Sequence, residues 1–257
     1  MLLMAACAGT PDRGSTADYR LDSATQGCRQ RPDLCARMAG EEALLPTLRT
    51  AEAVAATVRT GAAAFRVLEA AAKAMVEKEL TACVEHARSQ VLVDHLRGRS
   101  PTRQECNEVV VDTKSGRRIT RAMQLGCLMH EVALACTRKA LGERLPGRFS
   151  LEQRYQYDPK SGALKLVSNE EARSLLRRGC SEELTGTLVP DVVIHSGDPL
   201  EAEAVYDFKF PCVNGATTAW RDYPLGHSYE GLSQKQVYKS VLGAEALRVL
   251  PRWGVLP

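Results

Sequence analysis

The sequence has no long hydrophobic run, few aromatic residues and almost no excess of charge of either sign. No apolar stretch in its 257 residues approaches the roughly 18 to 20 residues that crossing a membrane requires, so we expect no membrane-spanning helix. Cys-x-x-Cys and His-x-x-x-His are both absent, so we do not expect a zinc site. With 34 basic and 31 acidic side chains, the net charge of +3 does not by itself indicate nucleic-acid binding. The composition, 44% hydrophobic and 25% charged, suffices to bury a core and excludes a disordered chain or a collagen-like fibre.

Cysteine, by contrast, is abundant. Nine cysteines are many for a reducing cytosol, and an odd number cannot all pair within one chain. The opening run Met-Leu-Leu-Met-Ala-Ala-Cys resembles the end of a bacterial lipoprotein signal, in which apolar and small residues precede a lipid-modified cysteine. The resemblance implies a lipid on Cys7, attachment to a membrane through it, and eight remaining cysteines in an oxidising compartment. The alternative is a ragged N-terminus with a chance cysteine.

The pairing of those eight cysteines does not follow from the sequence, because eight allow 105 connectivities. Cys127 and Cys136 lie nine residues apart on one expected helix, about 900° of rotation, so they face opposite sides and cannot pair. Cys28 and Cys35 are the easiest local pair. Free buried cysteines remain an alternative for the others.

Composition divides the chain into three regions. Residues 1–40 are expected to be the signal remnant and a flexible tether, because Gly, Asp, Arg, Ser and Thr dominate them. Residues 41–100 are Ala-rich and predict two or three helices, either a small bundle or a cover for the next domain, with a linker at 97–102. Residues 101–257 mix helical and strand patterns and predict an α/β domain.

The expected elements of this domain follow from hydrophobic periodicity and turn residues. The helices are one at 119–141, apolar almost all round and stopped by Gly142, a short one capped by Asn169 and ending near Gly179, and one at 229–242. The strands are Val109–Val111, 151–157, Leu164–Val167, 187–195, 204–210 and 246–250.

The most informative feature is Pro190-Asp191, followed sixteen residues later by Asp207-Phe208-Lys209. Side chains alternate across a strand, so Asp207 and Lys209 share one face with Glu203 and Val205. Tyr206, Phe208 and Phe210 then point to the opposite face and can fill a core. Charged groups in an otherwise apolar strand are costly to bury and need a reason.

Two aspartates that meet at one point form a hard oxygen site suited to Mg²⁺ or Mn²⁺. A lysine beside them can orient a water molecule or stabilise negative charge on a phosphate. Asp191, Asp207 and Lys209 together therefore predict metal-dependent hydrolysis of a phosphodiester.

These residues resemble the PD-(D/E)XK nuclease superfamily, which has the restriction-endonuclease fold. Pro190-Asp191 and Asp207-x-Lys209 match its two strand motifs. Glu131 matches the glutamate that members carry on the preceding helix, and Gln234-x-x-x-Tyr238 matches a motif of exonuclease-like branches on the following helix.

The resemblance implies a metal held by Asp191, Asp207 and Glu131, catalysis by these residues with Lys209, and substrate positioning by Gln234 and Tyr238. It covers about 106–257. Two alternatives stay open: Glu131 as a buried acid paired with Arg121 or Arg138, and Gln234 with Tyr238 as structural residues.

Other polar residues carry weaker expectations. His130 and His195 are expected in the core or at its rim. The loop of His227 could touch substrate, but packing of Trp220 and Tyr223 is the expectation there. Two basic groups could contact phosphates or simply face solvent: Lys114, Arg117, Arg118 and Arg121, and Arg173, Arg177 and Arg178.

The order of signal, tether, helical region and nuclease-like domain resembles a bacterial polymorphic toxin. This implies an exported, lipid-anchored antibacterial nuclease that cleaves DNA rather than RNA inside a target cell, with a cognate immunity protein as partner. The rival readings are a non-enzymatic envelope lipoprotein that binds a ligand, and a cytoplasmic repair or phage-defence nuclease of the same fold.

Overall fold

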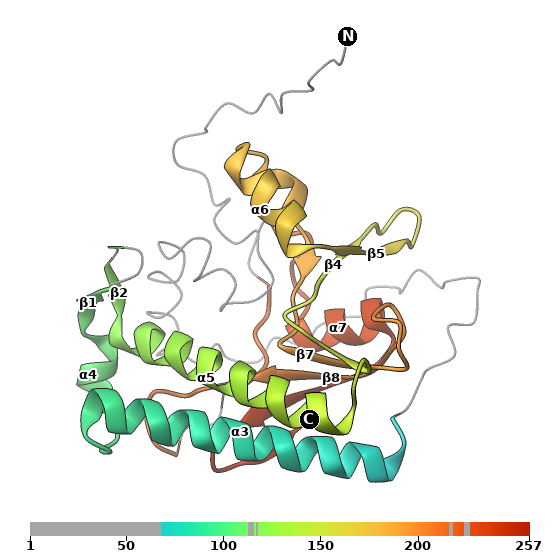
Figure 1. Cartoon of the computed structure of the whole chain (residues 1–257). Coiled ribbons are helices and arrows are strands. Elements are labelled where there is room, and N and C mark those ends of the chain that lie inside the picture. Colours follow the sequence, from blue (N-terminus) through green and yellow to red (C-terminus); the bar gives the residue numbers. More distant parts are fainter. Residues whose placement is uncertain (1–67, 113–115, 117, 216–217, 224–226) are drawn as a thin grey trace.

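The computed structural model describes residues 68–112, 116, 118–215, 218–223 and 227–257, and the chain there is a mixed α/β fold (Figure 1). Within these residues no helix has the length and hydropathy to cross a membrane. Residues 1–67 lie outside the described part, and with them Cys7, the expected pair Cys28 and Cys35, and most of the Ala-rich region.

A five-stranded sheet organises the fold, with the strand order β10-β9-β8-β7-β3. Its strands are β3 (Phe149–Leu151), β7 (Val192–His195), β8 (Ala202–Phe208), β9 (Glu245–Leu250) and β10 (Gly254–Leu256). β3, β7 and β8 are antiparallel neighbours, whereas β8 and β9 are parallel. A parallel pair needs a crossover connection, and here it contains helix α7 (Gln234–Leu242).

Helices cover both faces of this sheet. On one face α3 (Ala70–Leu96) and α5 (Arg121–Arg144) lie side by side, and their apolar residues share one core with Tyr206 and Phe208 (Figure 1). On the other face α7 packs its Val237 and Tyr238 on the small residues of the strands. The alternation of β8 is as the sequence predicts, because Tyr206 and Phe208 lie in one core and Val205 in the other.

A smaller sheet stands beside the first. It has the order β5-β4-β6, with β4 (Arg154–Tyr157), β5 (Leu164–Val167) and β6 (Thr187–Leu188). Helix α6 (Asn169–Arg177) and the 3₁₀ turn η2 (Ser181–Leu184) connect β5 to β6 around a small apolar core. Near the start of α5, β1 (Val109–Val111) and β2 (Arg118–Thr120) form a separate two-stranded ribbon.

Two expected strands are each broken in two. The stretches 151–157 and 187–195 each leave one sheet and join the other, so β3 and β7 belong to the large sheet while β4 and β6 belong to the small one. The first break has Glu152 at φ 48°, and the second has Pro190, which lacks an N–H for a ladder. The breaks meet, since the N–H of Glu152 donates to the carbonyl of Asp191 at 3.1 Å.

Helix boundaries also differ from expectation. Ile119 belongs to β2, Thr120 caps α5, and α5 continues through Gly142 to Arg144. Only one side of α5 is buried, and its charged residues lie on the side that faces solvent. Ser168, not Asn169, caps α6, and α7 begins at Gln234 behind a capping box on Ser233. The sequence did not predict β10.

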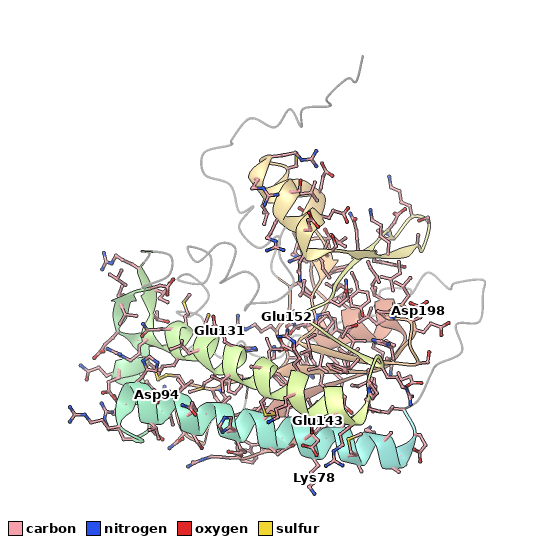
Figure 2. The ribbon with its side chains drawn as sticks, in the orientation of Figure 1. Lys78, Asp94, Glu131, Glu143, Glu152 and Asp198 are labelled. Carbon is pink, nitrogen blue, oxygen red and sulfur yellow. A yellow bond between two sulfur atoms is a disulfide. The ribbon has the colours of Figure 1, made fainter. Side chains whose placement is uncertain are left out.

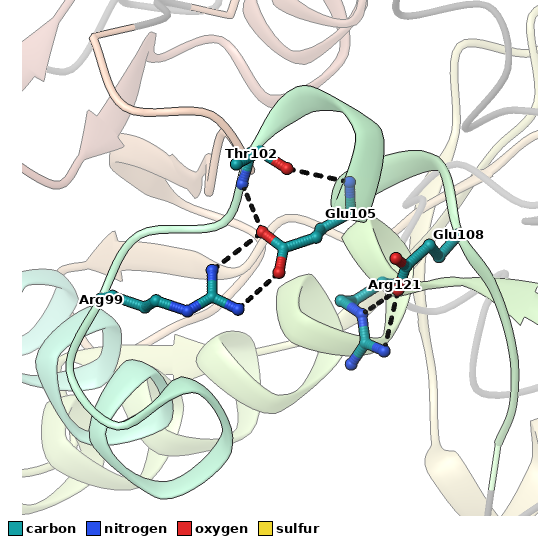
Figure 3. A network of polar contacts seen from close by, with 5 residues as sticks. All are labelled: Arg99, Thr102, Glu105, Glu108 and Arg121. Carbon is teal, nitrogen blue, oxygen red and sulfur yellow. Dashed lines mark hydrogen bonds and ion pairs between the residues drawn. The ribbon is translucent and has the colours of Figure 1, made fainter.

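The boundary expected near residue 100 does not separate two cores. Val76, Leu80 and Val84 of α3 lie in the same apolar cluster as α5 and the sheet, so α3 covers the α/β domain. Residues 97–102 are short connecting chain, and α4 (Arg103–Asn107) follows with a capping box between Thr102 and Glu105 (Figure 3).

Disulfides join these elements. Cys83 of α3 bonds to Cys136 of α5, which confirms that Cys136 does not pair with Cys127. Cys106 of α4 bonds to Cys212, just beyond β8, and Cys180 is also disulfide-bonded. Cross-links between distant elements are typical of proteins that fold in oxidising compartments.

Candidate functional site

The two predicted aspartates lie opposite each other on neighbouring strands. Val192 pairs with Tyr206 in the antiparallel ladder of β7 and β8, so one step further places Asp191 opposite Asp207. Both side chains are almost fully buried, with exposed fractions of 1% and 2%. The sheet therefore brings together two carboxylates that are sixteen residues apart in the chain.

The backbone of both sheets holds Asp191. Its Oδ2 accepts a hydrogen bond of 2.7 Å from the N–H of Phe208. Its carbonyl accepts the N–H of Glu152 at the point where the chain leaves the large sheet. The position of this carboxylate is thus determined by three strands.

Asp207 begins a chain of polar contacts toward α7. Lys209, two residues further on the same face, forms an ion pair with Asp207 through its ammonium. The same ammonium donates to Oε1 of Gln234 at 3.0 Å, and Nε2 of Gln234 donates to the hydroxyl of Tyr238 at 2.9 Å. Four predicted residues from β8, the chain after it and α7 are therefore joined in one network.

The two carboxyl groups have shifted pKa values in opposite directions. Burial raises the pKa of Asp207 above its ordinary value, and the charge of Asp191 adds to this while Lys209 opposes it. Burial also acts to raise the pKa of Asp191, but the His130 ring, the Phe208 N–H and Lys209 outweigh it and lower the pKa. The two environments thus push the pKa values of the carboxyl groups apart, a division that is typical of functional carboxyl pairs.

Helix α5 places His130, the neighbour of Glu131 in the chain, next to Asp191. Nδ1 of His130 lies 3.6 Å from Oδ1 of Asp191, too far for a hydrogen bond, and this buried nitrogen has no hydrogen-bond partner. Phe210 holds the ring by an edge contact at 5.0 Å between centroids. Glu131 lies on the same helix (Figure 2), about 100° further round, and is half-buried.

The spacing of buried residues along α5 indicates that His130 lies on the buried face of this helix. The buried positions of α5 include Met129, Ala133 and Leu141, and they follow the spacing of one helix face. His130 precedes Leu134 by four residues and Thr137 by seven, so it belongs to that face. Arg121, one expected partner for Glu131, pairs with Glu108 at 3.0 Å (Figure 3).

The side chains at this site are of types that bind metal ions, but they are not arranged around a common point. Two aspartates and the ring of His130 lie near one another here, whereas no group of three His, Cys, Asp or Glu side chains that could hold a metal ion is found in the described part of the chain. The ammonium of Lys209 lies where it neutralises Asp207. Contacts in the described part of the chain connect Asp191 with His130 and Asp207 with Lys209, and the role of Glu131 as a third ligand stays a prediction.

Other expected residues lie elsewhere. His195 is buried, and Ser150 lies 3.1 Å from its Nε2; the N–H of Gly197 donates to Nδ1, so Nε2 carries the proton and cannot act as a base toward the serine. Burial lowers the pKa of His227 to about 4, and its ring stacks on Tyr223. Of the basic groups, Arg173, Arg177 and Arg178 are exposed on or next to α6, while Lys114 and Arg117 lie outside the described residues.

Comparison of the chain with protein-family models, with curated proteins and with solved structures finds no match.

Proposed function

We propose that the protein is a divalent-metal-dependent nuclease that hydrolyses phosphodiester bonds, with DNA as the substrate. The observation that carries the proposal is the position of Asp191, directly before β7, beside Asp207 of β8, together with the contact of Lys209 to Asp207 and Gln234. Buried carboxylates beside an ammonium are unfavourable in a core and are typical of sites that bind a cation and a phosphate.

The architecture supports the same proposal. The order α5, then β3, β7 and β8, then α7 and β9 is the order helix, strands, helix, strand of the restriction-endonuclease fold that the motifs resemble. Its two motif strands are neighbours here, with the Gln-x-x-x-Tyr helix packed on the face that carries Asp207.

We assign the cation to Asp191, Asp207 and His130, with Glu131 in a supporting role. Adjacent ligands of an octahedral cation lie about 3 Å apart, close to the separation of His130 from Asp191. Oxygen ligands suit Mg²⁺ and Mn²⁺ alike, and an imidazole nitrogen shifts the preference toward Mn²⁺. Such a cation, when bound, polarises the scissile phosphate.

The remaining residues act on the substrate side. When the cation neutralises Asp207, the ammonium of Lys209 turns from this carboxylate toward a phosphate oxygen. Gln234 keeps the ammonium within reach, and Tyr238 fixes the amide of Gln234 from inside the core, where it is fully buried.

The disulfides support an exported protein. Cys83–Cys136 and Cys106–Cys212 connect elements that are 53 and 106 residues apart, as in proteins that mature outside the cytosol. An exported nuclease finds its substrate in another cell, so we propose an antibacterial toxin, with an immunity protein as its partner and a lipid on Cys7 as its anchor.

The test is cleavage by the purified full-length chain of plasmid DNA and of total RNA, with Mg²⁺, Mn²⁺ or a chelator. Cleavage should require the cation and should fall about 1,000-fold in Asp207→Asn and Lys209→Met. Glu203→Gln is the matched control, because Glu203 shares the strand face of Asp207 but pairs with Arg148 at the far end.

Equal cleavage by the folded Asp207→Asn and wild-type proteins would remove the assignment of the site. If the wild type cleaved neither nucleic acid with either cation, the envelope-binding alternative would take its place. Reduced cysteines and an unmodified Cys7 in native material would favour the intracellular nuclease instead.

A further inference from the structure

Beside the proposed catalytic residues lies a second cationic group that they do not use. Arg248 of β9 pairs in register with Asp207, on the face of the sheet that α7 covers. Its guanidinium is half-buried, and burial lowers its pKa. Among the described residues no Asp or Glu side chain forms an ion pair with it.

Trp220 connects this arginine to the catalytic lysine. The ammonium of Lys209 lies 5.7 Å from the centre of the indole ring and the guanidinium of Arg248 lies 5.8 Å from it. The ring also meets Tyr238 edge to face at 6.3 Å. Trp220 thus contacts two cations and a residue of the proposed positioning pair.

Both side chains have N–H donors that lack an acceptor. The indole Nε1 of Trp220 and the Nε of Arg248 are covered and form no hydrogen bond. The other nitrogens of Arg248 are engaged, since Nη1 donates to the carbonyl of Thr218 and Nη2 donates at 2.7 Å to an oxygen of Pro257, the last residue of the chain. A buried donor without an acceptor costs about 1–3 kcal/mol, which an oxygen ligand would offset.

The chain around Trp220 is anchored, so these donors are held in place. Just beyond it, Asp222 bridges to Ser233, and the N–H of Tyr223 donates to the carbonyl of Leu232 at 2.9 Å. On the strand side the N–H of Lys209 donates to the carbonyl of Val249, next to Arg248. Trp220, Arg248 and Lys209 are therefore fixed relative to one another by the backbone.

We propose that Trp220 and Arg248 form a subsite for a backbone phosphate of the nucleic-acid substrate, next to the scissile phosphate at Lys209. The inference rests on the proposed nuclease function and adds to it the residues that hold the flanking nucleotide. A phosphate has acceptor oxygens for both free donors and a negative charge that suits a site between two cations. Its neighbour along the strand lies within reach of Lys209.

The experiment measures binding of single-stranded and duplex oligonucleotides by the full-length Asp207→Asn protein across a range of salt concentrations. Arg248→Gln should weaken binding about tenfold and reduce the slope of log affinity against log salt by about 0.7 to 0.9, one phosphate contact. Arg248→Lys should restore most of the slope. Arg252→Gln, which removes the same charge from an exposed position four residues away, is the matched control and should change neither quantity.

Trp220→Phe separates a ligand role from a structural one. It keeps the ring and removes the free donor, so binding should weaken about threefold to tenfold with an unchanged salt slope, while stability to denaturant should be equal or higher. With Trp253→Phe as background, Trp220 is the remaining tryptophan of the chain, and its fluorescence should respond to oligonucleotide.

The outcomes are distinguishable from failure of the proposed function. If the wild type cleaves DNA but Arg248→Gln and Trp220→Phe bind oligonucleotide as the Asp207→Asn parent does, the subsite is wrong and the nuclease stands. If Trp220→Phe loses stability and binding together, the indole is structural and the subsite is likewise wrong. If the wild type neither binds nor cleaves nucleic acid, both proposals fall.

Discussion

On one face of the five-stranded sheet β8 presents Tyr206 and Phe208 to α3 and α5, and on the other it presents Val205 and Asp207 to α7. The first face is a continuous apolar core, cross-linked by Cys83–Cys136. The second combines small apolar side chains with the network from Asp207 to Tyr238. The difference teaches that one strand can carry stability and chemistry at once, because alternate side chains belong to different environments.

Substitutions at two adjacent residues of β8 test whether its two faces differ in their contribution to stability. Phe208→Ala should lower the free energy of unfolding by about 3–5 kcal/mol, because it leaves a cavity beside α5. Asp207→Asn should change that free energy by about 1 kcal/mol or less, because the raised pKa of Asp207 means that its charge is not favoured by the fold. Denaturant unfolding of both variants measures the difference, and equal destabilisation would contradict the division of the two faces.

The disulfide on the apolar face gives the next largest effect. Cys83→Ser with Cys136→Ser should lower the free energy of unfolding by about 3 kcal/mol, because the unfolded chain regains the freedom of a long loop. Activity per folded molecule should stay the same, since neither cysteine contacts the site network. Cys127→Ser, on the same helix, is the control in which both described disulfides remain; a loss of specific activity in the double variant alone would link the apolar face to the site.

The smallest effect concerns His227, which is packed against Tyr223 on the α7 side. Its folded pKa of about 4 lies below the unfolded value of about 6.5, so only the unfolded chain takes up the proton between these values. Stability should therefore fall by about 1–2 kcal/mol as the pH drops from 6.5 to 4, allowing for partial exposure. His227→Phe should lack this part of the decline, whereas His95→Gln, at an exposed position, should keep it; identical pH curves for all three proteins would refute the assignment.

Much of the site was predictable because its residues lie on regular elements. The period of a strand places Asp207 and Lys209 on one face, and the period of a helix places Gln234 and Tyr238 one turn apart. Those geometric expectations agree with the contacts of Lys209 and Gln234 in the structure. Their catalytic roles stay predictions.

The parts that could not be predicted depend on long-range pairing. An apolar run such as 187–195 has the same pattern whether it stays in one sheet or crosses into another, so the breaks at Glu152 and Pro190 were not foreseen. Disulfide partners depend on the packing of α3 on α5, which a sequence pattern does not specify. The contact of His130 with Asp191 depends on helix phase, because one residue along a helix changes the direction of the side chain by about 100°.

The hydrogen bond from the N–H of Glu152 to the carbonyl of Asp191 joins the two ends of the segment that forms the smaller sheet. Residues 152–191 leave the large sheet and return to it at the same place, while Leu151 and Val192 on either side are already paired. The smaller sheet is nevertheless tied to the frame, because Tyr155 of β4 and Leu188 of β6 lie in the same apolar cluster as Val193 of β7. Asp191 thereby stands at a branch point where one chain passes between two sheets that share a core, so a change in the packing of β4 or β6 reaches the site through the core as well as through the backbone.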